Sequence, residues 1–308
     1  MPLRPLRIGT RGSPMALHQA GLVRDRLRAA HPDLAAEGAV ELVAIRTTGD
    51  RVQTRLLAEI GGKGLFTKEI EEALIDRRID LAVHSLKDME TVLPAGLDIG
   101  CVLARDDPRD ALVSRGGGLA DLPRGARIGT ASLRRRAQLL RYRGDFAIAP
   151  MRGNVGTRLD KLAAGEVDAL VLALCGLQRL GKAGVASEIL APELMLPAVG
   201  QGALAIECRA ADDRLRRRLA PLNDPATAAS VAAERAMLAA LDGSCRTPIA
   251  GLATIHEGRL GLDALLLAPD GNAERRGRIA GRVEDAVALG TELGERLRRD
   301  AGPEFGFG

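Results

Sequence analysis

The order of hydrophobic and polar positions predicts strands and helices that alternate along the chain. Residues 6–10 (Leu-Arg-Ile-Gly-Thr) are typical of a short buried strand. A helical pattern follows over residues 14–30, with Pro14 suited to the first turn and Ser13 to the N-cap. Further strands are expected at 40–45 and 80–85, with a helix over 65–77 between them. This alternation indicates a mainly parallel α/β sheet.

The same plan occurs a second time. Residues 126–130 echo residues 6–10, and Ser132 precedes the next helix as Ser13 does. Residues 165–171 echo residues 77–83, and in both copies a strand opens with an aspartate. We therefore expect two similar α/β domains with a hinge near residues 101–107. Ligands of such sheets bind at the carboxyl ends of strands, where the two Ile-Gly-Thr turns would favour anions, although one such turn alone is a generic connector.

The last third of the chain has a different pattern. A strand at 203–208 could return to the first domain, and residues 226–241 form an amphipathic helix behind Asp224 and Pro225. Antiparallel strands at 249–254 and 260–267, with a turn at 256–258, precede a final helix over 283–299. The predicted domains are 1–103 with 203–221, then 104–202, then 222–308. The fold class is α/β for the first two domains, with a small C-terminal α+β domain.

The composition is that of an ordinary globular protein, 46% hydrophobic and 27% charged. The four cysteines include no CxxC pair and match no zinc pattern, so no metal is expected. Cys101, Cys175 and Cys208 lie in apolar contexts and are interpreted as small buried residues. The start of the chain has no apolar signal-peptide core, and no apolar run is long enough to span a bilayer. We expect a cytoplasmic protein, and a monomer because no heptad repeat is present.

Charge gives the first indication of a ligand. The formal net charge is +4, and only five of the 44 basic residues are lysines. Arginines gather at predicted helix starts, around 134–136 and 152–158, where they oppose the helix dipole unless an anion binds. The alternatives are a GC-rich genome that uses arginine often and a solvated basic turn. With aromatic residues at only 2% and acids interspersed among the bases, nucleic-acid binding is disfavoured.

Two further segments hold candidate chemistry. Lys87 and Asp88 follow the strand at 80–85, where a carboxylate could stabilise positive charge or could simply face water. Cys245 lies in a loop rich in glycine, serine and proline beside Arg246, a context that favours a reactive thiolate. A lone loop cysteine is more often incidental, so composition leaves both interpretations open.

Taken together, these segments resemble the porphobilinogen deaminase family over nearly the whole chain. The resembling stretches are RIGTRGSPMAL (7–17), GGKGLFTKEIE (61–71), DLAVHSLKD (80–88), RDDPRDA (105–111), GTASLRRRAQL (129–139), RGNVGTRLDKL (152–162), LPAVGQGALAIECR (196–209) and GSCRTPI (243–249). The resemblance implies first and second domains like periplasmic binding proteins. It also implies an enzyme that joins four porphobilinogen molecules into linear hydroxymethylbilane, with release of ammonia, on a dipyrromethane cofactor held by a thioether.

The resemblance assigns roles to individual residues. Asp88 and Lys87 are the expected catalytic residues, with Asp88 binding pyrrole N–H groups. The cofactor would be attached to Cys245 and held by Ser13, Lys87, Asp88, Thr130, Ser132, Arg134, Arg135, Gly153 and Arg158. The carboxylates and rings of the substrate would be bound by Arg11, Ser13, Ser85, Arg152, Arg158, Arg179, Lys63 and Gln201. Lys63 lies in a glycine-rich loop that is expected to be mobile and to cover the cleft.

The sequence departs from the family beside Asp88. Met89-Glu90 stand where relatives usually place a proline, which puts the geometry of this loop in question. One alternative function is a non-catalytic anion-binding protein with the same two-domain cleft. Such a protein would bind its ligand without releasing ammonia, and the third domain and Cys245 argue against it. Nucleic-acid binding, suggested by an isoelectric point near 9.1, is the other alternative.

Overall fold

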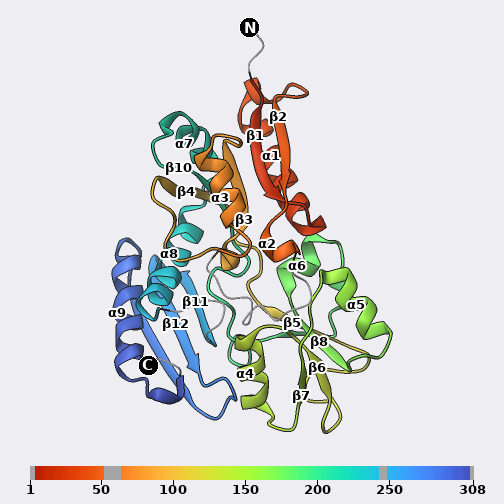
Figure 1. The fold of residues 1–308 in the computed structure, drawn as a ribbon. Coiled ribbons are helices and arrows are strands. Elements are labelled where there is room, and N and C mark those ends of the chain that lie inside the picture. Colours follow the sequence, from red (N-terminus) through yellow and green to blue (C-terminus); the bar gives the residue numbers. More distant parts are fainter. Residues whose placement is uncertain (1–3, 52–63, 243–247, 306–308) are drawn as a thin grey trace. The chain divides into compact units, whose positions relative to one another are not determined.

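The computed structural model describes residues 4–51, 64–242 and 248–305. The chain divides into two compact units. The described part of the first comprises residues 4–51, 64–105 and 203–228, and that of the second comprises 106–202, 229–242 and 248–305. Each unit is built around sheets covered by helices (Figure 1).

The first unit has a five-stranded sheet in the order β2-β1-β3-β10-β4. Its strands are β1 (Leu6–Arg11), β2 (Val40–Ile45), β3 (Leu81–Ser85), β4 (Leu97–Val102) and β10 (Leu204–Arg209). Its helices are α1 (Pro14–Ala30), α2 (Thr48–Arg51), α3 (Lys68–Ile75) and α7 (Asp213–Leu219), with short 3-10 turns at Pro32–Leu34, Leu86–Asp88 and Ala220–Leu222. Strand β1 pairs in parallel with β2 and β3, whereas β10 lies antiparallel between β3 and β4.

The second unit repeats this plan in the order β7-β6-β8-β5-β9. Its strands are β5 (Asp110–Ser114), β6 (Arg127–Gly129), β7 (Ala147–Ala149), β8 (Ala169–Ala173) and β9 (Glu188–Leu190). Its helices are α4 (Leu133–Tyr142), α5 (Val155–Ala163) and α6 (Leu174–Arg179), with a 3-10 turn at Ala183–Val185. Here β5 is the antiparallel strand, between β8 and β9.

The repeated sequence motifs make the same contacts in both sheets. The backbone N–H of Arg7 donates to the Asp80 carboxylate at 2.9 Å, and the N–H of Asp80 donates to the Arg7 carbonyl at 2.9 Å. Arg127 and Asp168 make the same two bonds, at 2.7 and 2.8 Å. The aspartate that opens each strand therefore joins it to the neighbouring parallel strand.

The C-terminal part contains a three-stranded antiparallel sheet in the order β11-β12-β13. The strands are β11 (Ile249–His256), β12 (Arg259–Leu267) and β13 (Glu274–Arg282), and the helices are α8 (Pro225–Ala240) and α9 (Ala286–Arg299), with 3-10 turns at Val283–Asp285 and Pro303–Phe305. The buried Glu234 carboxylate of α8 accepts N–H groups from Gly200 at 2.7 Å and Ala253 at 2.8 Å. The predicted α/β class with a small C-terminal α+β part is thus confirmed.

Several predicted boundaries are confirmed. Helix α1 spans 14–30 with Ser13 as its N-cap, and the Asp224 side chain accepts the N–H of Thr227 at the start of α8. Two predictions are wrong. Helix α3 is shorter than 65–77 because residues 65–67 form a turn and Arg77 adopts a left-handed φ of 58°. The final helix begins at Ala286, after a 3-10 turn, instead of at Val283.

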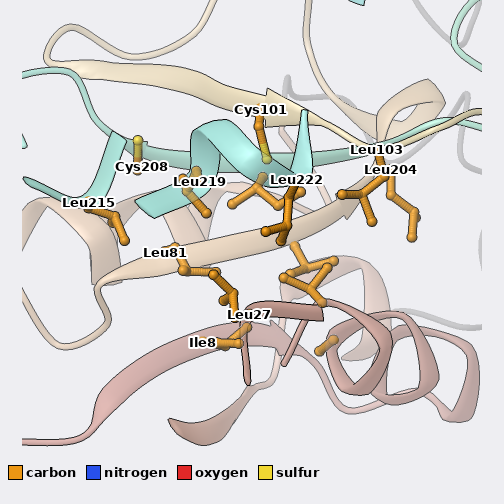
Figure 2. Close-up of a cluster of buried hydrophobic side chains, with 14 of the residues drawn as sticks. Ile8, Leu27, Leu81, Cys101, Leu103, Leu204, Cys208, Leu215, Leu219 and Leu222 are labelled. Atoms are coloured by element: carbon orange, nitrogen blue, oxygen red, sulfur yellow. The ribbon is translucent and has the colours of Figure 1, made fainter. Parts of the chain in front are cut away.

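The core of the first unit combines residues that are distant in the sequence. Figure 2 shows Ile8, Leu27 and Leu81 packed with leucines from β10 and the segment after it. Cys101 and Cys208 lie in this cluster, 3% and 0% exposed. Cys175 is also buried, so the interpretation of all three cysteines as small core residues is confirmed.

Helices α8 and α9 approach closely through two glycines. A Cβ placed on Gly290 would lie 2.1 Å from the Ala233 carbonyl oxygen, and one on Gly294 would lie 2.6 Å from that of Met237. Since these neighbours are backbone atoms, a side chain at either position would force the helices apart.

We predict that Gly290→Ala lowers the free energy of unfolding by about 1–3 kcal/mol, the usual cost of overpacking. The matched control is Gly21→Ala in α1, where a Cβ meets no atom within 4 Å. That change should raise stability by up to about 1 kcal/mol, because alanine is the better helix former. Urea unfolding of the two variants measures the difference, and equal stabilities would contradict the prediction.

Candidate functional site

The predicted catalytic segment lies at the carboxyl end of β3. The Leu86 N–H donates to the Ala203 carbonyl at 3.0 Å, and the Met89 N–H donates to the Leu86 carbonyl at 3.1 Å. Leu86 and Met89 are buried, 2% and 7% exposed, while Asp88 between them is exposed and Lys87 is half-buried. Two apolar anchors therefore hold a short turn that presents the Asp88 carboxylate to solvent.

The predicted binding residues of β1, β3 and the start of α1 already have protein partners. The Arg11 guanidinium donates to the Asp50 carboxylate at 2.5 Å and lies 4.1 Å from the centre of the Phe66 ring. The Ser13 hydroxyl caps α1 by accepting the Ala16 N–H at 3.3 Å. Ser85 is bonded to the buried Gln19, whose amide nitrogen lies 2.9 Å from the Ser85 hydroxyl.

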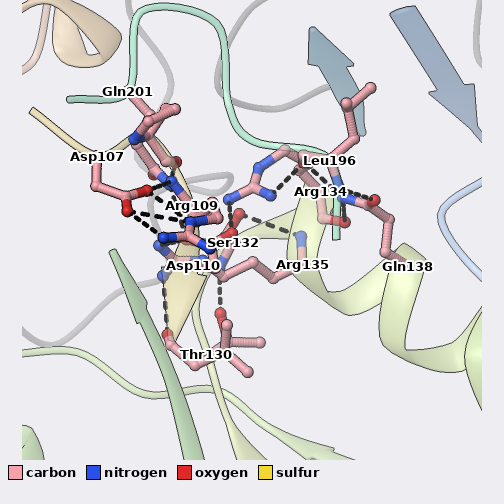
Figure 3. A network of polar contacts seen from close by, with 12 residues as sticks. Asp107, Arg109, Asp110, Thr130, Ser132, Arg134, Arg135, Gln138, Leu196 and Gln201 are labelled. Carbon is pink, nitrogen blue, oxygen red and sulfur yellow. Dashed lines mark hydrogen bonds and ion pairs between the residues drawn. The ribbon is translucent and has the colours of Figure 1, made fainter. Parts of the chain in front are cut away.

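In the second unit, Asp110 is the centre of a buried polar network (Figure 3). One carboxylate oxygen accepts from Arg134 at 2.7 Å, and the other accepts from Arg135 at 2.8 Å and from Gln201 at 2.9 Å. Arg134 also donates to the Leu196 carbonyl, and Arg135 donates to the Val171 carbonyl. The two arginines are only 5% and 8% exposed in their side chains.

This network sets the protonation of Asp110. Burial alone would raise the pKa of its carboxyl group, but the Coulombic attraction of Arg134 and Arg135 outweighs burial. The pKa therefore lies well below its ordinary value. Two guanidinium groups against one carboxylate leave this buried cluster with a net positive charge.

The start of α5 carries further positive charge. Asn154 caps the helix by accepting the Thr157 N–H at 2.9 Å. Gly153 has a φ of 113°, which favours glycine, and its carbonyl accepts from the Arg158 guanidinium at 2.8 Å. Burial, with repulsion from Arg135 and Arg152, lowers the pKa of Arg158 to about 10. A bound anion would relieve that repulsion, so this end of α5 is suited to carboxylates.

The remaining predicted residues are placed as follows. Thr130 is buried, its hydroxyl accepts the Ser132 N–H at 3.2 Å, and Ser132 caps α4 by accepting the Arg135 N–H at 3.4 Å. Arg179 donates to the Asp106 carboxylate at 2.7 Å and to the Gly202 carbonyl at 2.8 Å. Lys63 and Cys245 lie outside the described residues. Within the described chain, no group of three or more histidine, cysteine or acidic residues could hold a metal ion.

Sequence reasoning missed the acids that pair with the predicted arginines, namely Asp50, Asp106 and Asp110. The signal for Asp110 was present, since two adjacent arginines on the buried side of a helix require a counter-ion. The segment RDDPRDA (105–111) contains three aspartates, and only the structure shows which of them is buried.

We predict that Asp110→Asn lowers the free energy of unfolding at about pH 7 by about 3–5 kcal/mol, because both guanidinium groups lose their buried counter-charge. The control, Asp160→Asn, changes an exposed aspartate of α5 and should be nearly neutral. Urea unfolding of wild type and both variants measures the loss, and equal stability of the two variants would contradict it.

Wild type and Asp110→Asn can also be compared at different pH values. A depressed carboxyl pKa stabilises the fold above the unfolded value of 3.8 and loses that contribution as the pH falls. The stability gap between wild type and Asp110→Asn should therefore stay constant from about pH 7 to about pH 5 and narrow as the pH falls below about 4.

Comparisons with known proteins agree with this picture. The chain matches the family model "Porphobilinogen deaminase, dipyromethane cofactor binding domain" over residues 6–217 and the model "Porphobilinogen deaminase, C-terminal domain" over 228–299. It is 52% identical to porphobilinogen deaminase of Paracoccus denitrificans, covering 99% of this chain and 97% of the relative. It is also 52% identical to that of Sorangium cellulosum, covering 96% and 98%.

Among solved structures, YhfZ from Shigella flexneri matches with a TM-score of 0.39 and 12% identity, covering 79% of this chain and 93% of that one. The periplasmic aliphatic sulphonate binding protein SsuA from Escherichia coli matches with a TM-score of 0.40 and 15% identity, covering 78% and 71%. The two family models and the two relatives span nearly the whole sequence. The chain belongs to the porphobilinogen deaminase family.

Proposed function

We propose that this chain joins four porphobilinogen molecules head to tail into linear hydroxymethylbilane, with Asp88 as its catalytic carboxylate. Membership of the porphobilinogen deaminase family carries the reaction. The exposed Asp88, held between buried Leu86 and Met89 at the end of β3, carries the assignment of the residue.

The chemistry to be assisted is a substitution at the aminomethyl carbon of the substrate. Its carbon–nitrogen bond breaks, and nitrogen leaves as ammonia. The same carbon then bonds to the free α-carbon of the preceding pyrrole, which loses its proton, and water releases the finished chain. Loss of ammonia places positive charge on the pyrrole N–H. A carboxylate that accepts this hydrogen bond stabilises the charge as it develops.

Asp88 is suited to both parts of this step. As an ionised carboxylate it accepts the N–H of the ring that carries the developing charge. It also binds the N–H of the preceding ring and so orients that ring's α-carbon for attack. Lys87, next to it, supplies an ammonium group for the substrate carboxylates.

The basic residues fit the cofactor. Each pyrrole ring of a dipyrromethane brings two carboxylates, and the Arg158 guanidinium, with its lowered pKa beside Arg135 and Arg152, is a group that an anion would stabilise. We propose attachment at Cys245, with binding by Ser13, Lys87, Asp88, Thr130, Ser132, Arg134, Arg135, Gly153 and Arg158. Bound there, the cofactor supplies the first free pyrrole α-carbon.

The substrate carboxylates and rings are assigned to Arg11, Ser13, Ser85, Arg152, Arg158, Arg179, Lys63 and Gln201. Arg11 and Arg179 would serve while paired with Asp50 and Asp106, since a guanidinium has five N–H donors. Besides these roles, Arg134 and Gln201 bind Asp110 and donate to the carbonyls of Leu196 and Pro108.

We also propose three domains, formed by 1–103 with 203–221, by 104–202 and by 222–308. The protein would act as a cytoplasmic monomer that binds a small molecule and no nucleic acid. No helix of the described chain has the length and hydrophobicity to cross a bilayer. The interspersed acids and scarce aromatic residues disfavour nucleic-acid binding.

A covalently attached cofactor should add a defined mass to the polypeptide. The denatured wild-type protein should exceed its polypeptide mass by one dipyrromethane, and Cys245→Ser should lack the excess because no thioether forms. Intact-protein mass spectrometry makes the measurement. A bare wild-type mass that stays bare after incubation with porphobilinogen would exclude the tethered cofactor.

Asp88→Asn should lower kcat by at least about 10²–10³-fold, the usual cost of losing a group that stabilises transition-state charge. Since Asp88 is exposed, the unfolding transition should stay unchanged. Release of ammonia and formation of hydroxymethylbilane report activity. Near-normal turnover of the variant would remove Asp88 from the catalytic role.

A further inference from the structure

Glu90, two residues after Asp88, is bonded to a distant part of the first unit. Its carboxylate accepts the backbone N–H of Gly64 at 3.0 Å. Both residues are half-buried, and they are 26 positions apart in the sequence. A hydrogen bond from an N–H to a charged acceptor is stronger than one between neutral groups, so this contact is able to restrain the backbone.

Gly64 opens the turn that leads into α3. It has a left-handed φ of 72°, and its carbonyl accepts the N–H groups of Thr67 at 3.1 Å and Lys68 at 3.0 Å. Its own N–H donates to the Glu90 carboxylate. Glu90 is therefore attached to the turn that precedes α3.

Helix α3 is itself fixed on the strand that carries the catalytic turn. Ile70, Ala73 and Leu74 of α3 are fully buried against Ile79 and Ala82, which flank and form β3. Asp88 is therefore linked to β3 twice. One link runs directly along the chain, and the other runs through Glu90, Gly64 and α3, so that the contacts form a closed ring. The catalytic turn is thus held on its leading side by the Leu86–Ala203 bond and on its trailing side by Glu90.

The charged groups around this ring are mostly acidic. On α3, Glu71 is 8% exposed, and its pKa is raised by burial, with smaller contributions from Glu207 and Glu90. The buried Glu207 of β10 is paired with His84 of β3 at 3.0 Å. Among these carboxylates, Glu90 is the one that meets a backbone N–H of the α3 turn in the described structure, and removing it leaves that N–H without its acceptor.

We propose that Glu90 is a positioning residue, whose bond to the Gly64 N–H holds the Lys87-Asp88 turn in the geometry that the reaction requires. The proposal rests on the proposed role of Asp88. A shift of about 1 Å in a catalytic group can cost about 100-fold in rate, so a side chain that fixes this turn influences turnover without touching substrate.

The experiment compares Glu90→Ala, which removes the acceptor, with Glu90→Gln, whose amide oxygen still accepts the Gly64 N–H. The control is Glu37→Ala, an exposed glutamate in the same unit. For each cofactor-loaded protein, kcat is measured per mole of bound dipyrromethane, together with KM and the midpoint of urea unfolding. Counting only loaded molecules removes any effect of the substitution on assembly.

We expect Glu90→Ala to lower kcat about tenfold with KM changed by less than about threefold, because the carboxylate of Asp88 is misplaced rather than lost. Glu90→Gln should restore most of that kcat, and Glu37→Ala should match wild type. Unchanged kcat in Glu90→Ala, even with a lower unfolding midpoint, would show a structural role only and overturn the proposal. Equal losses in Glu90→Ala and Glu90→Gln would also overturn it, since the hydrogen bond would then not be responsible.

The experiments distinguish failure of the positioning role of Glu90 from failure of the proposed function. If wild-type protein forms no hydroxymethylbilane, or if Asp88→Asn is fully active, the proposed function fails. If wild type is active, Asp88→Asn is inactive and Glu90→Ala equals wild type, only the positioning role fails.

Discussion

The interior of the second unit depends on one buried carboxylate. Asp110, at the start of β5, is bonded to two arginines of α4 and to Gln201. Through those arginines it is connected to the Leu196 carbonyl and to the Val171 carbonyl of β8. A helix, two strands and the segment around 196–201 are therefore joined through this one carboxylate. Because charges in a protein interior need partners, this carboxylate favours one arrangement of these elements.

One arginine of this network also influences the charge at the start of α5. Arg135 contacts Asp110, and burial together with repulsion from Arg135 and Arg152 lowers the pKa of the Arg158 guanidinium. One acid cannot neutralise both arginines of α4, so positive potential remains beside Gly153 and Asn154. The fold thus keeps a region of uncompensated positive charge in position before any anionic ligand binds, which is the form of preorganisation that favours carboxylates.

Much of the architecture could be predicted from the sequence because its causes are local. Ser13 and Pro14 set the start of α1, and the apolar runs predicted most central strands. Strand β13 was not predicted, because its nine residues include four arginines and show little hydrophobic alternation. Such a composition is suited to its position at the edge of the sheet. Asp88 was a candidate from its place after a strand, and the resemblance implied its catalytic role. The acid partners of the arginines were not found, because Arg11 and Asp50 are 39 positions apart and spacing gives no sign of such a contact.

The first sheet combines strands from distant parts of the sequence, and this has a consequence for synthesis of the chain. Strand β10 pairs with β3 and β4 in the middle of the first sheet, although residues 106–202 of the second unit precede it. Leu204, Ile206 and Leu219 also complete the core that Ile8 and Leu27 begin. The amino-terminal half emerges from the ribosome with a gap in its sheet and an open core. It reaches its final form only after residue 222 has been made, so the second α/β sheet, whose strands all lie within 110–190, is able to form first.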